Sequence, residues 1–573
     1  MRILMLASEA VPLAKTGGLA DVAGTLPVEL ARLGHEVQLA LPRYASIDPK
    51  AAGLRQTATV AVPFRSDSVE VGIETGALGN KAVSLICIRY DPFFGRAGLY
   101  GEEGRDYPDN LERFVLFCRA VLEACRQPTR PPHVLHAHDW QTALAVAYLK
   151  TLYRDDPAWE KTRVLFTIHN MGYQGRFPVM DYPATGLPWS EYTPERLEFY
   201  GQVNVLKGGL VYADMLNTVS PTYAREIQTS EFGHGLEGVL QARKDRLFGV
   251  TNGIDYDVWN PATDPHLPAH YSAKDLSGKK ACKTALQREM KLPARNVPLL
   301  GMVSRLAFQK GIDLVVEIIP KLLELDVQMV VLGSGEPAYH ERLTDLSTRY
   351  PGKLAVRLAF DEGLAHLIEA GADLFLMPSR YEPCGLNQQY SLRYGTVPVV
   401  RKTGGLADTV VPYLPVGEKG NKATGFAFET PQPEVLLSTI LLALRVYRDK
   451  EEWEALMRRG MKQDFSWQRS AKQYVELYQR ARDSVAHSDC LPRYATTRHY
   501  YRGAKRGRQR NFKKWLKCRH AQRLSLIGSS QLQHVAATAF ADAQLLHARG
   551  EQHAAGIVAV IGLSQGVRRQ LER

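Results

Sequence analysis

The heptapeptide Lys15-Thr-Gly-Gly-Leu-Ala-Asp21 recurs without change at Lys402–Asp408. Each copy is predicted to follow a strand and to open a helix. Paired glycines let the backbone approach a ligand, and the first turn of a helix offers unpaired N–H groups and a positive dipole end. One such loop in each half of the chain predicts an anionic or polyhydroxyl ligand held from two sides. The alternative is a turn that needs glycine only for its shape.

Short apolar runs alternate with stretches of helical spacing on both sides of the heptapeptides, which is typical of parallel sheets covered by helices. In the first half, a helix is predicted at Asp21–Leu33. The predicted strands of this half are Arg2–Ala7, Glu36–Leu41, His133–Ala137, Arg163–Ile168, Met215–Val219 and Leu247–Val250.

The alternation stops at Asp255–Ser277, where the run WNPATDPHLP contains three prolines, and this break predicts a domain boundary. It then resumes, so we expect an α/β protein with two doubly wound domains in series. Ligands of such domains bind beyond the carboxyl ends of the strands and between domains. The second half is predicted to contain strands Val297–Val303, Gln328–Leu332, Leu354–Arg357 and Asp373–Met377, and helices from Gly311, from Glu336 and at Leu364–Ala370.

The 573 residues are 45% hydrophobic and 23% charged, which indicates a globular protein with more than one core. Of the 72 basic and 60 acidic residues, 16 and 4 lie in residues 487–573, so the rest of the chain carries 56 of each sign. A neutral body argues against a nucleic-acid enzyme and suits a neutral or small substrate.

The basic tail, residues 487–573, is the one part of the sequence whose charge suits nucleic acid. Its first part interleaves arginines with aromatic side chains, which is compatible with an arm that binds RNA or an anionic surface. We favour a simpler interpretation, a disordered extension or a read-through in a shifted frame, because no domain pattern is visible.

Seven scattered cysteines without a CxxC pair indicate reduced thiols rather than a disulfide framework or a zinc site. The apolar run that begins at Ile3 is too short for a signal peptide. The longest apolar stretch of the tail, Ala554–Leu563, is half of the roughly 20 residues that span a bilayer. We therefore expect a soluble cytoplasmic protein with no membrane partner.

Polar side chains follow two predicted strands of the first half. The run His136–Trp140, which reads HAHDW, offers Asp139 and a neutral imidazole to ligand hydroxyls; the alternatives are a metal site and a helix cap. The run Thr167–Asn170 places His169 at a second strand end, either against a sugar hydroxyl or as a buried, satisfied histidine.

In the second half, the loop Ser304–Gly311 places Arg305 and Lys310 after a strand, where a planar fork and a point charge can clamp a diphosphate. The alternative is a solvated basic loop. No GxxxxGK[ST] loop occurs, and no GxGxxG follows the first strand, which weakens a nicotinamide hypothesis.

The run Pro378–Leu386 places Glu382 between a strand and a helix, where its carboxylate can bond ribose hydroxyls or steady a positive sugar transition state. The alternative is a helix N-cap. The acidic pair Asp255-Tyr-Asp257 lies in the connector, so we predict a turn or hinge there and no metal.

Taken together, these motifs resemble bacterial glycogen synthase and plant starch synthase from residue 1 to about Arg482. The motifs occur in the family's order: KTGGLADV, HAHDW, TIHN, the run from Ala213-Asp214 to Ser220–Ala224, TNGID, SRLAFQKG, PSRYEPCGL and RKTGGLADTV.

The resemblance implies a GT-B fold, in which two Rossmann-like domains face each other across a deep cleft. Residues 1–255 would form the acceptor-side domain, 256–465 the donor-side domain, and 466–486 a helix that returns to the first domain. The implied activity is the retaining transfer of glucose from ADP-glucose to the non-reducing end of glycogen or another α-1,4-glucan. No cofactor or metal is implied beyond the donor substrate, and domain closure is expected about residues 250–260.

The resemblance also assigns roles at the reacting centre. Asp139 and His169 would bond the transferred glucose, Arg305 and Lys310 would neutralise the departing ADP diphosphate, and Glu382 would lie in the catalytic centre. Many retaining relatives carry a second acid seven residues after the first, where this chain has a glutamine, as the bacterial class also does. The implied donor-binding residues are Lys15, Gly18, Asp21, Cys384, Gly385, Leu386, Thr403, Gly404 and Gly405.

The residues leave two alternatives open. One is a GT-B transferase with another donor, such as UDP-glucose, or another acceptor. The other is a glucan-binding or nucleotide-sugar-binding protein without catalysis, against which the intact Lys15, Arg305, Lys310 and Glu382 argue.

Overall fold

A computed structural model describes residues 1–414 and 422–484, so the predicted basic tail lies outside the described residues. The five cysteines in the described ranges are buried and form no disulfide. Within the same ranges, no helix has both the length and the apolar character needed to cross a bilayer.

The first half folds around a nine-stranded sheet in the order β14-β13-β9-β8-β1-β2-β5-β4-β3. The strands from β14 to β5 are parallel, and β4 and β3 extend the sheet as antiparallel strands. Their bounds are β1 Arg2–Leu6, β2 Glu36–Pro42, β3 Arg55–Phe64, β4 Asp67–Leu78, β5 Val83–Arg89, β8 Val134–His138, β9 Arg163–Ile168, β13 Met215–Thr218 and β14 Leu247–Gly249.

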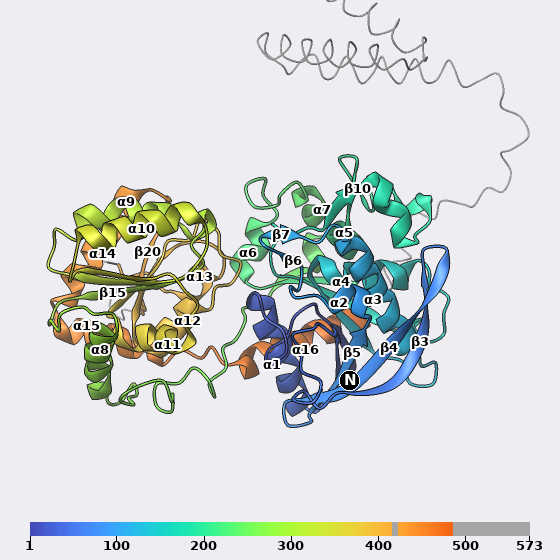
Figure 1. The fold of residues 1–573 in the computed structure, drawn as a ribbon, viewed down its shortest axis with the longest axis horizontal. Helices are drawn as coiled ribbons and strands as arrows, with labels where there is room; N and C mark the ends of the chain where they lie inside the picture. Colours follow the sequence, from blue (N-terminus) through green and yellow to red (C-terminus); the bar gives the residue numbers. More distant parts are fainter. Residues whose placement is uncertain (415–421, 485–573) are drawn as a thin grey trace, which may run out of the picture. The chain divides into compact units, whose positions relative to one another are not determined.

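The second half folds around a fully parallel six-stranded sheet in the order β17-β16-β15-β18-β19-β20. Helices α9, α10 and α14 lie on one side of this sheet and α8 and α11 on the other (Figure 1). The strand bounds are β15 Leu299–Val303, β16 Gln328–Leu332, β17 Leu354–Arg357, β18 Leu374–Met377, β19 Val397–Arg401 and β20 Phe426–Phe428.

Helices cover the two sheets and bury their apolar strands, which explains why these strands read as continuous hydrophobic runs. The helix bounds are α1 Gly18–Arg32, α2 Asp91–Phe94, α3 Asn110–Ala124, α4 Asp139–Lys150, α5 Val205–Tyr212, α6 Pro221–Glu226, α7 Glu237–Ala242, α8 Ser277–Glu289, α9 Ile312–Leu322, α10 Pro337–Arg349, α11 Glu362–Gly371, α12 Asn387–Arg393, α13 Gly404–Thr409, α14 Pro433–Tyr447, α15 Lys450–Met461 and α16 Trp467–Asp483. Small ribbons complete the fold: β6 Gly101–Glu102, β7 Arg105–Asp106, β10 Arg176–Pro178, β11 Glu198–Phe199 and β12 Gln202–Asn204.

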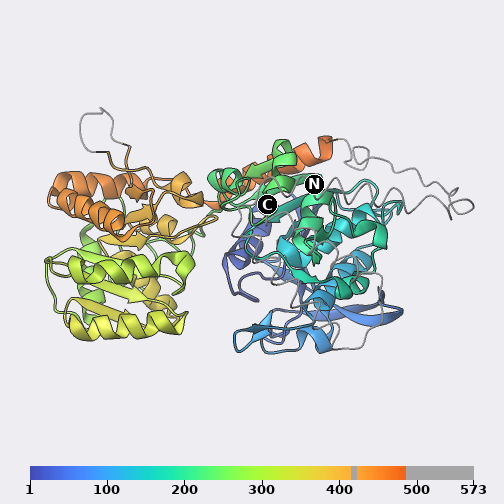
Figure 2. The same cartoon turned by 90° about the horizontal axis from the view of Figure 1, so that it is seen from above.

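Every strand predicted from the sequence is confirmed to within two residues at each end. The returning helix is also confirmed as α16, which packs on β8, β9, β13 and α1 of the first domain. Figure 2 shows this helix, in orange, lying with the elements of the first domain although it follows the second in sequence.

The two heptapeptides differ in their setting. The second copy follows β19 directly, with α13 beginning at Gly404, as predicted. The prediction for the first copy is wrong in part: it opens α1, but residues 7–17 separate that helix from the end of β1. The extra loop gives the first copy room that the second copy lacks.

Each sheet reverses its strand order at one point, between β8 and β1 in the first domain and between β15 and β18 in the second. At such a point the loops leaving adjacent strands diverge to opposite faces, and a crevice opens beyond the strand ends. Asp139 follows β8 directly, and Arg305 and Ser379 follow β15 and β18. Asp139 and Arg305, two of the predicted site residues, therefore lie at the topological switch points.

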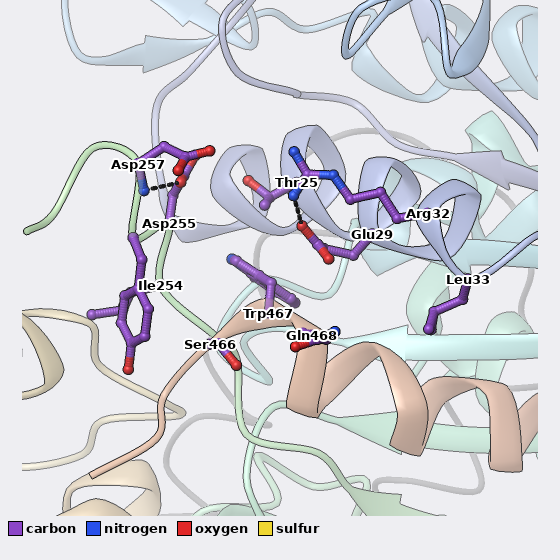
Figure 3. Close-up of a pocket in the computed structure, with 11 residues that line it drawn as sticks. Thr25, Glu29, Arg32, Leu33, Ile254, Asp255, Asp257, Ser466, Trp467 and Gln468 are labelled. Atoms are coloured by element: carbon purple, nitrogen blue, oxygen red, sulfur yellow. Dashed lines mark hydrogen bonds and ion pairs between the residues drawn. The ribbon is translucent and has the colours of Figure 1, made fainter. Parts of the chain in front are cut away.

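Two chain crossings join the domains. The N–H of Ile254 donates to the carbonyl of Phe465 at 2.8 Å, and the Ser470 hydroxyl donates to the carbonyl of Thr251 at 2.7 Å. Beside these crossings, α1, the connector and the start of α16 line a cavity of about 290 Å³ (Figure 3). The predicted turn at the acidic pair is confirmed, since the N–H of Asp257 donates to Asp255 Oδ1 at 2.9 Å.

Gly253 is required where the two crossings touch, because a Cβ atom there would lie 2.6 Å from the backbone nitrogen and Cα of Trp467. We expect Gly253→Ala to lower the free energy of unfolding by about 1–3 kcal/mol through overpacking. Gly238 in α7 is the control, since its Cβ would meet no atom within 4 Å and alanine favours a helix. Denaturant midpoints check this, and equal midpoints for Gly253→Ala and wild type would contradict it.

Candidate functional site

Asp139 is fixed at the end of β8 by the backbone that follows β9. Its Oδ1 accepts the N–H of His169 at 2.7 Å, and its own φ of +55° lies in the left-handed region. A non-glycine residue in that region stores backbone strain, which the surrounding structure must support. Burial raises the pKa of Asp139 to about 7, while the amides of His169 and Asn170 act in the opposite direction. The carboxyl is thus held by two amides at a switch point.

His138 and His169 meet beside Asp139, with His138 Nδ1 and His169 Nε2 2.9 Å apart. Burial lowers the pKa of His169 to about 3 and lowers the pKa of His138 well below its usual value, so both imidazoles are neutral at neutral pH. The helix-cap alternative is wrong, since the side chain of His138 bonds no N–H of α4. Across residues 1–414 and 422–484, no group of three metal-ligating side chains is arranged to hold an ion.

A second polar layer under these histidines comes from α16. The Tyr478 hydroxyl lies 2.8 Å from His136 Nδ1, and His136 Nε2 lies 2.7 Å from Thr167 Oγ1. Asn217 donates to the Tyr474 hydroxyl at 3.1 Å. Sequence reasoning missed this layer, because its tyrosines lie more than 250 residues away from their partners and carry no motif of their own.

In the second domain, Glu382 lies next to the switch point between β15 and β18. Its Oε2 accepts the ammonium of Lys310 at 2.6 Å and the hydroxyl of Ser379 at 2.9 Å, and the carboxylate is buried. The N-cap alternative is wrong, since Leu386 is the residue that precedes α12. The structure therefore brings together a glutamate and a lysine that are 72 residues apart.

Arg305 is exposed on the same loop as Lys310, and its guanidinium donates to Gln309 Oε1 at 3.1 Å. Within the described ranges it forms no ion pair with a carboxylate. The two predicted clamp residues thus differ: the charge of Lys310 is paired, whereas that of Arg305 is available to an anion.

The first heptapeptide binds a carboxylate of its own domain. Glu9 accepts the Thr16 N–H at 2.5 Å, the Thr16 hydroxyl at 2.7 Å and the Gly17 N–H at 3.1 Å. Lys15 pairs with Asp21 at 2.7 Å, and burial raises the pKa of this aspartate despite the nearby ammonium. A Cβ at position 17 or 18 would meet no atom within 4 Å, so the backbone here is open to an approaching ligand.

The second heptapeptide binds a carboxylate in the same way, but that carboxylate comes from the other domain. Glu226 of α6 accepts the Thr403 hydroxyl at 3.0 Å and the Gly404 N–H at 3.0 and 3.1 Å. Nearby, the Thr222 hydroxyl donates to Asp408 at 2.6 Å. The repeat is thus an oxyanion-binding loop in both domains.

The glycines of the second copy serve packing rather than access. Gly404 has a φ of +45°, and a Cβ there would lie 1.9 Å from the carbonyl oxygen of Glu382. A Cβ on Gly405 would lie 2.0 Å from the carbonyl oxygen of Cys384. The loop therefore lies directly on the backbone that carries Glu382, and side chains at these positions would separate the two.

Cys384 and Gln389 fill the interior behind this loop. Burial raises the pKa of the Cys384 thiol to about 12, which disfavours its thiolate form. The Gln389 amide donates to the carbonyl of Gly385 at 3.2 Å, and no carboxylate occupies this position. Glu382 is therefore the acidic side chain of the Pro378–Leu386 run.

Known protein families and relatives match this chain over both domains. The family described as "Starch synthase catalytic domain" matches residues 2–242, and "Glycosyl transferases group 1" matches residues 285–463. The chain is 51% identical to glycogen synthase of Anaeromyxobacter dehalogenans (strain 2CP-C) over 480 residues, which are 83% of this chain and 99% of that protein. It is 48% identical to glycogen synthase 2 of Geobacter sulfurreducens, with 84% and 99% covered.

A solved structure is similar over the same region. The catalytic domain of starch synthase IV from Arabidopsis thaliana, bound to ADP and acarbose, superposes with a TM-score of 0.78 at 36% identity and covers 84% of this chain and 99% of that one. With two Rossmann-like sheets in one GT-B fold and both halves matched, the chain is a glycosyltransferase that belongs to the glycogen synthase and starch synthase family.

Proposed function

We propose that the chain transfers glucose from ADP-glucose to the 4-hydroxyl at the non-reducing end of an α-1,4-glucan, with retention of configuration. The observation that carries the proposal is the oxyanion-binding loop at Thr403 and Gly404, which lies on the backbone of Glu382, the residue whose side chain bonds Lys310. Such a loop suits the diphosphate of a nucleotide sugar. We infer the glucan acceptor from the glycogen synthase and the starch synthase that the chain resembles.

In this proposal the bond between C1 of glucose and the phosphate oxygen breaks as a bond from the acceptor 4-oxygen to C1 forms on the same face. The acceptor proton passes to a phosphate oxygen of the departing ADP. Arg305, Lys310 and the amide of Gly404 would stabilise the charge that develops on the diphosphate. Asp139 and His169 would hold the hydroxyls of the transferred glucose, which fixes the reacting carbon beside the acceptor 4-hydroxyl on the face that the diphosphate leaves.

The competing proposals are a UDP-glucose donor and a binding protein without catalysis. Purified protein is incubated with ADP-glucose or UDP-glucose labelled in the sugar, with and without glycogen, and the polymer is then treated with β-amylase. We expect label in the polymer only with ADP-glucose and glycogen, and its release as maltose. Label from UDP-glucose alone, or none from either donor, would contradict the proposal.

Glu226 is expected to compete with the donor, because its carboxylate occupies the hydroxyl and amide that we assign to the diphosphate. Glu226→Ala should lower KM for ADP-glucose about tenfold with little change in kcat, since hydrogen bonds to a charged group contribute about 1.5–3 kcal/mol. Glu231→Gln is the control, because this exposed glutamate has an electrostatic interaction with Arg401 and likewise loses one negative charge when it is replaced. An unchanged or higher KM in Glu226→Ala would show that no such competition exists.

A further inference from the structure

His138 is fully buried and bonds the sugar-side residue His169 directly. It ends β8, His169 follows β9, and the two strands are parallel neighbours. The 2.9 Å contact joins Nδ1 of His138 to Nε2 of His169. The remaining nitrogen of His169, Nδ1, has no hydrogen-bond partner in the described part of the chain, whereas the remaining nitrogen of His138, Nε2, is buried without one.

These contacts select one arrangement of protons. Each neutral imidazole carries one N–H and one lone pair, so one ring donates to the other. If His169 donated, the proton of His138 would sit on its buried Nε2, and an orphaned buried N–H is the rarer and costlier defect. If His138 donates from Nδ1, its buried Nε2 carries only a lone pair. His169 then carries its own proton on Nδ1.

The layer below His138 limits its ring to this orientation. The ring of His136 lies against it, tilted by 37° with the ring centroids 4.0 Å apart, and His136 is itself held at both nitrogens by Tyr478 and Thr167. All of these side chains are buried. A ring flip of His138 would exchange the hydrogen-bonded nitrogen for a carbon, with no compensating partner.

We propose that His138 is a positioning residue, which donates its Nδ1 proton to His169 and thereby fixes His169 as an Nδ1–H donor toward a hydroxyl of the transferred sugar. The inference rests on the proposed function for its last step only. The tautomer of His169 is a property of the protein without substrate, so it can be measured whether or not glucose transfer occurs.

Three substitutions separate this role from simple packing. The amide nitrogen of asparagine reaches the place of histidine Nδ1, whereas that of glutamine reaches the place of Nε2. We expect His138→Asn to keep kcat within about threefold of wild type, while His138→Gln and His138→Leu lose roughly 10- to 100-fold, the range found when the partner that orients a histidine is removed. In a His169→Gln background, His138→Leu should add no further loss in kcat.

The direct readout is the nitrogen NMR spectrum of histidine-labelled protein, with His169 assigned by its loss in His169→Gln. We expect wild type and His138→Asn to show His169 protonated on Nδ1, and His138→Leu to show a mixture of tautomers. An Nε2-protonated His169 in wild type, or equal kcat losses for Asn and Leu with an unchanged tautomer, would overturn the proposal. A wild type that transfers no glucose but shows the Nδ1 tautomer would refute the proposed function and leave the positioning role intact.

Discussion

Alanine at Arg305 or at Lys310 is expected to lower kcat about 10²- to 10³-fold, the loss found when a preorganised group that stabilises transition-state charge is removed. Both side chains leave the switch point of the second sheet on the loop after β15. The guanidinium of Arg305 bonds only a neutral glutamine among the described residues, so it can take a phosphate oxygen without breaking an ion pair. Lys310 reaches the same region while bonded to Glu382.

The matched control for lost charge is Arg349→Ala, because Arg349 belongs to the same domain and pairs on the exposed surface of α10 with Asp345 at 2.6 Å. Exposed pairs of this kind contribute about 0–1 kcal/mol, so kcat should stay close to wild type. Lys310→Ala also leaves the buried carboxylate of Glu382 uncompensated, and unfolding midpoints must show that the variant remains folded at the assay temperature. Near wild-type kcat in both alanine variants would refute the cation clamp.

Substitution of Glu382 is expected to cause a loss of similar size. Its Oε2 holds the Lys310 ammonium and the Ser379 hydroxyl together, and its backbone carbonyl accepts the Gly405 N–H at 3.1 Å. Glu382→Ala removes the carboxylate and releases the lysine, so we expect kcat to fall about 10²- to 10³-fold. Glu382→Gln keeps two acceptor contacts without the charge, so its loss should be smaller.

Steady-state kinetics on the double variant Lys310→Ala/Glu382→Ala show whether the pair acts as a unit. We expect its kcat to be no lower than that of the worse single variant, because residues that act together lose their effect together. Asp345→Ala is the control for removal of an acid from an exposed pair. Additive losses in the double variant would mean that Glu382 acts independently of Lys310.

Most parallel strands could be predicted from the sequence because they are largely buried and read as apolar runs; β5, which is parallel to β2 and also largely buried, was missed although it reads as such a run. Strands β3 and β4, which are antiparallel, could not be predicted in the same way. β3 is mostly exposed, and its burial pattern offers neither a run nor a clear alternation. The long loop before the first heptapeptide was missed for a related reason, since nothing in the residues after β1 requires the helix to start only at Gly18.

The candidate site could be predicted where a residue follows a strand, as Asp139, His169 and Arg305 do. The repeat also indicates an oxyanion-binding loop, but it does not say which oxyanion the loop binds. Glu9 and Glu226 carry no motif, and Glu226 lies 178 residues from the amide it accepts. The partner Glu226 is set by the packing of the two domains, which local patterns do not encode.

The most direct test of the account compares the binding of ADP and AMP by calorimetry in wild type and in the double variant Arg305→Ala/Lys310→Ala. The central claim is that this region holds the second phosphate, so wild type should bind ADP about 100-fold more tightly than AMP. The double variant should bind AMP as wild type does and lose most of the advantage for ADP. An equal preference for ADP over AMP in both proteins would contradict the claim.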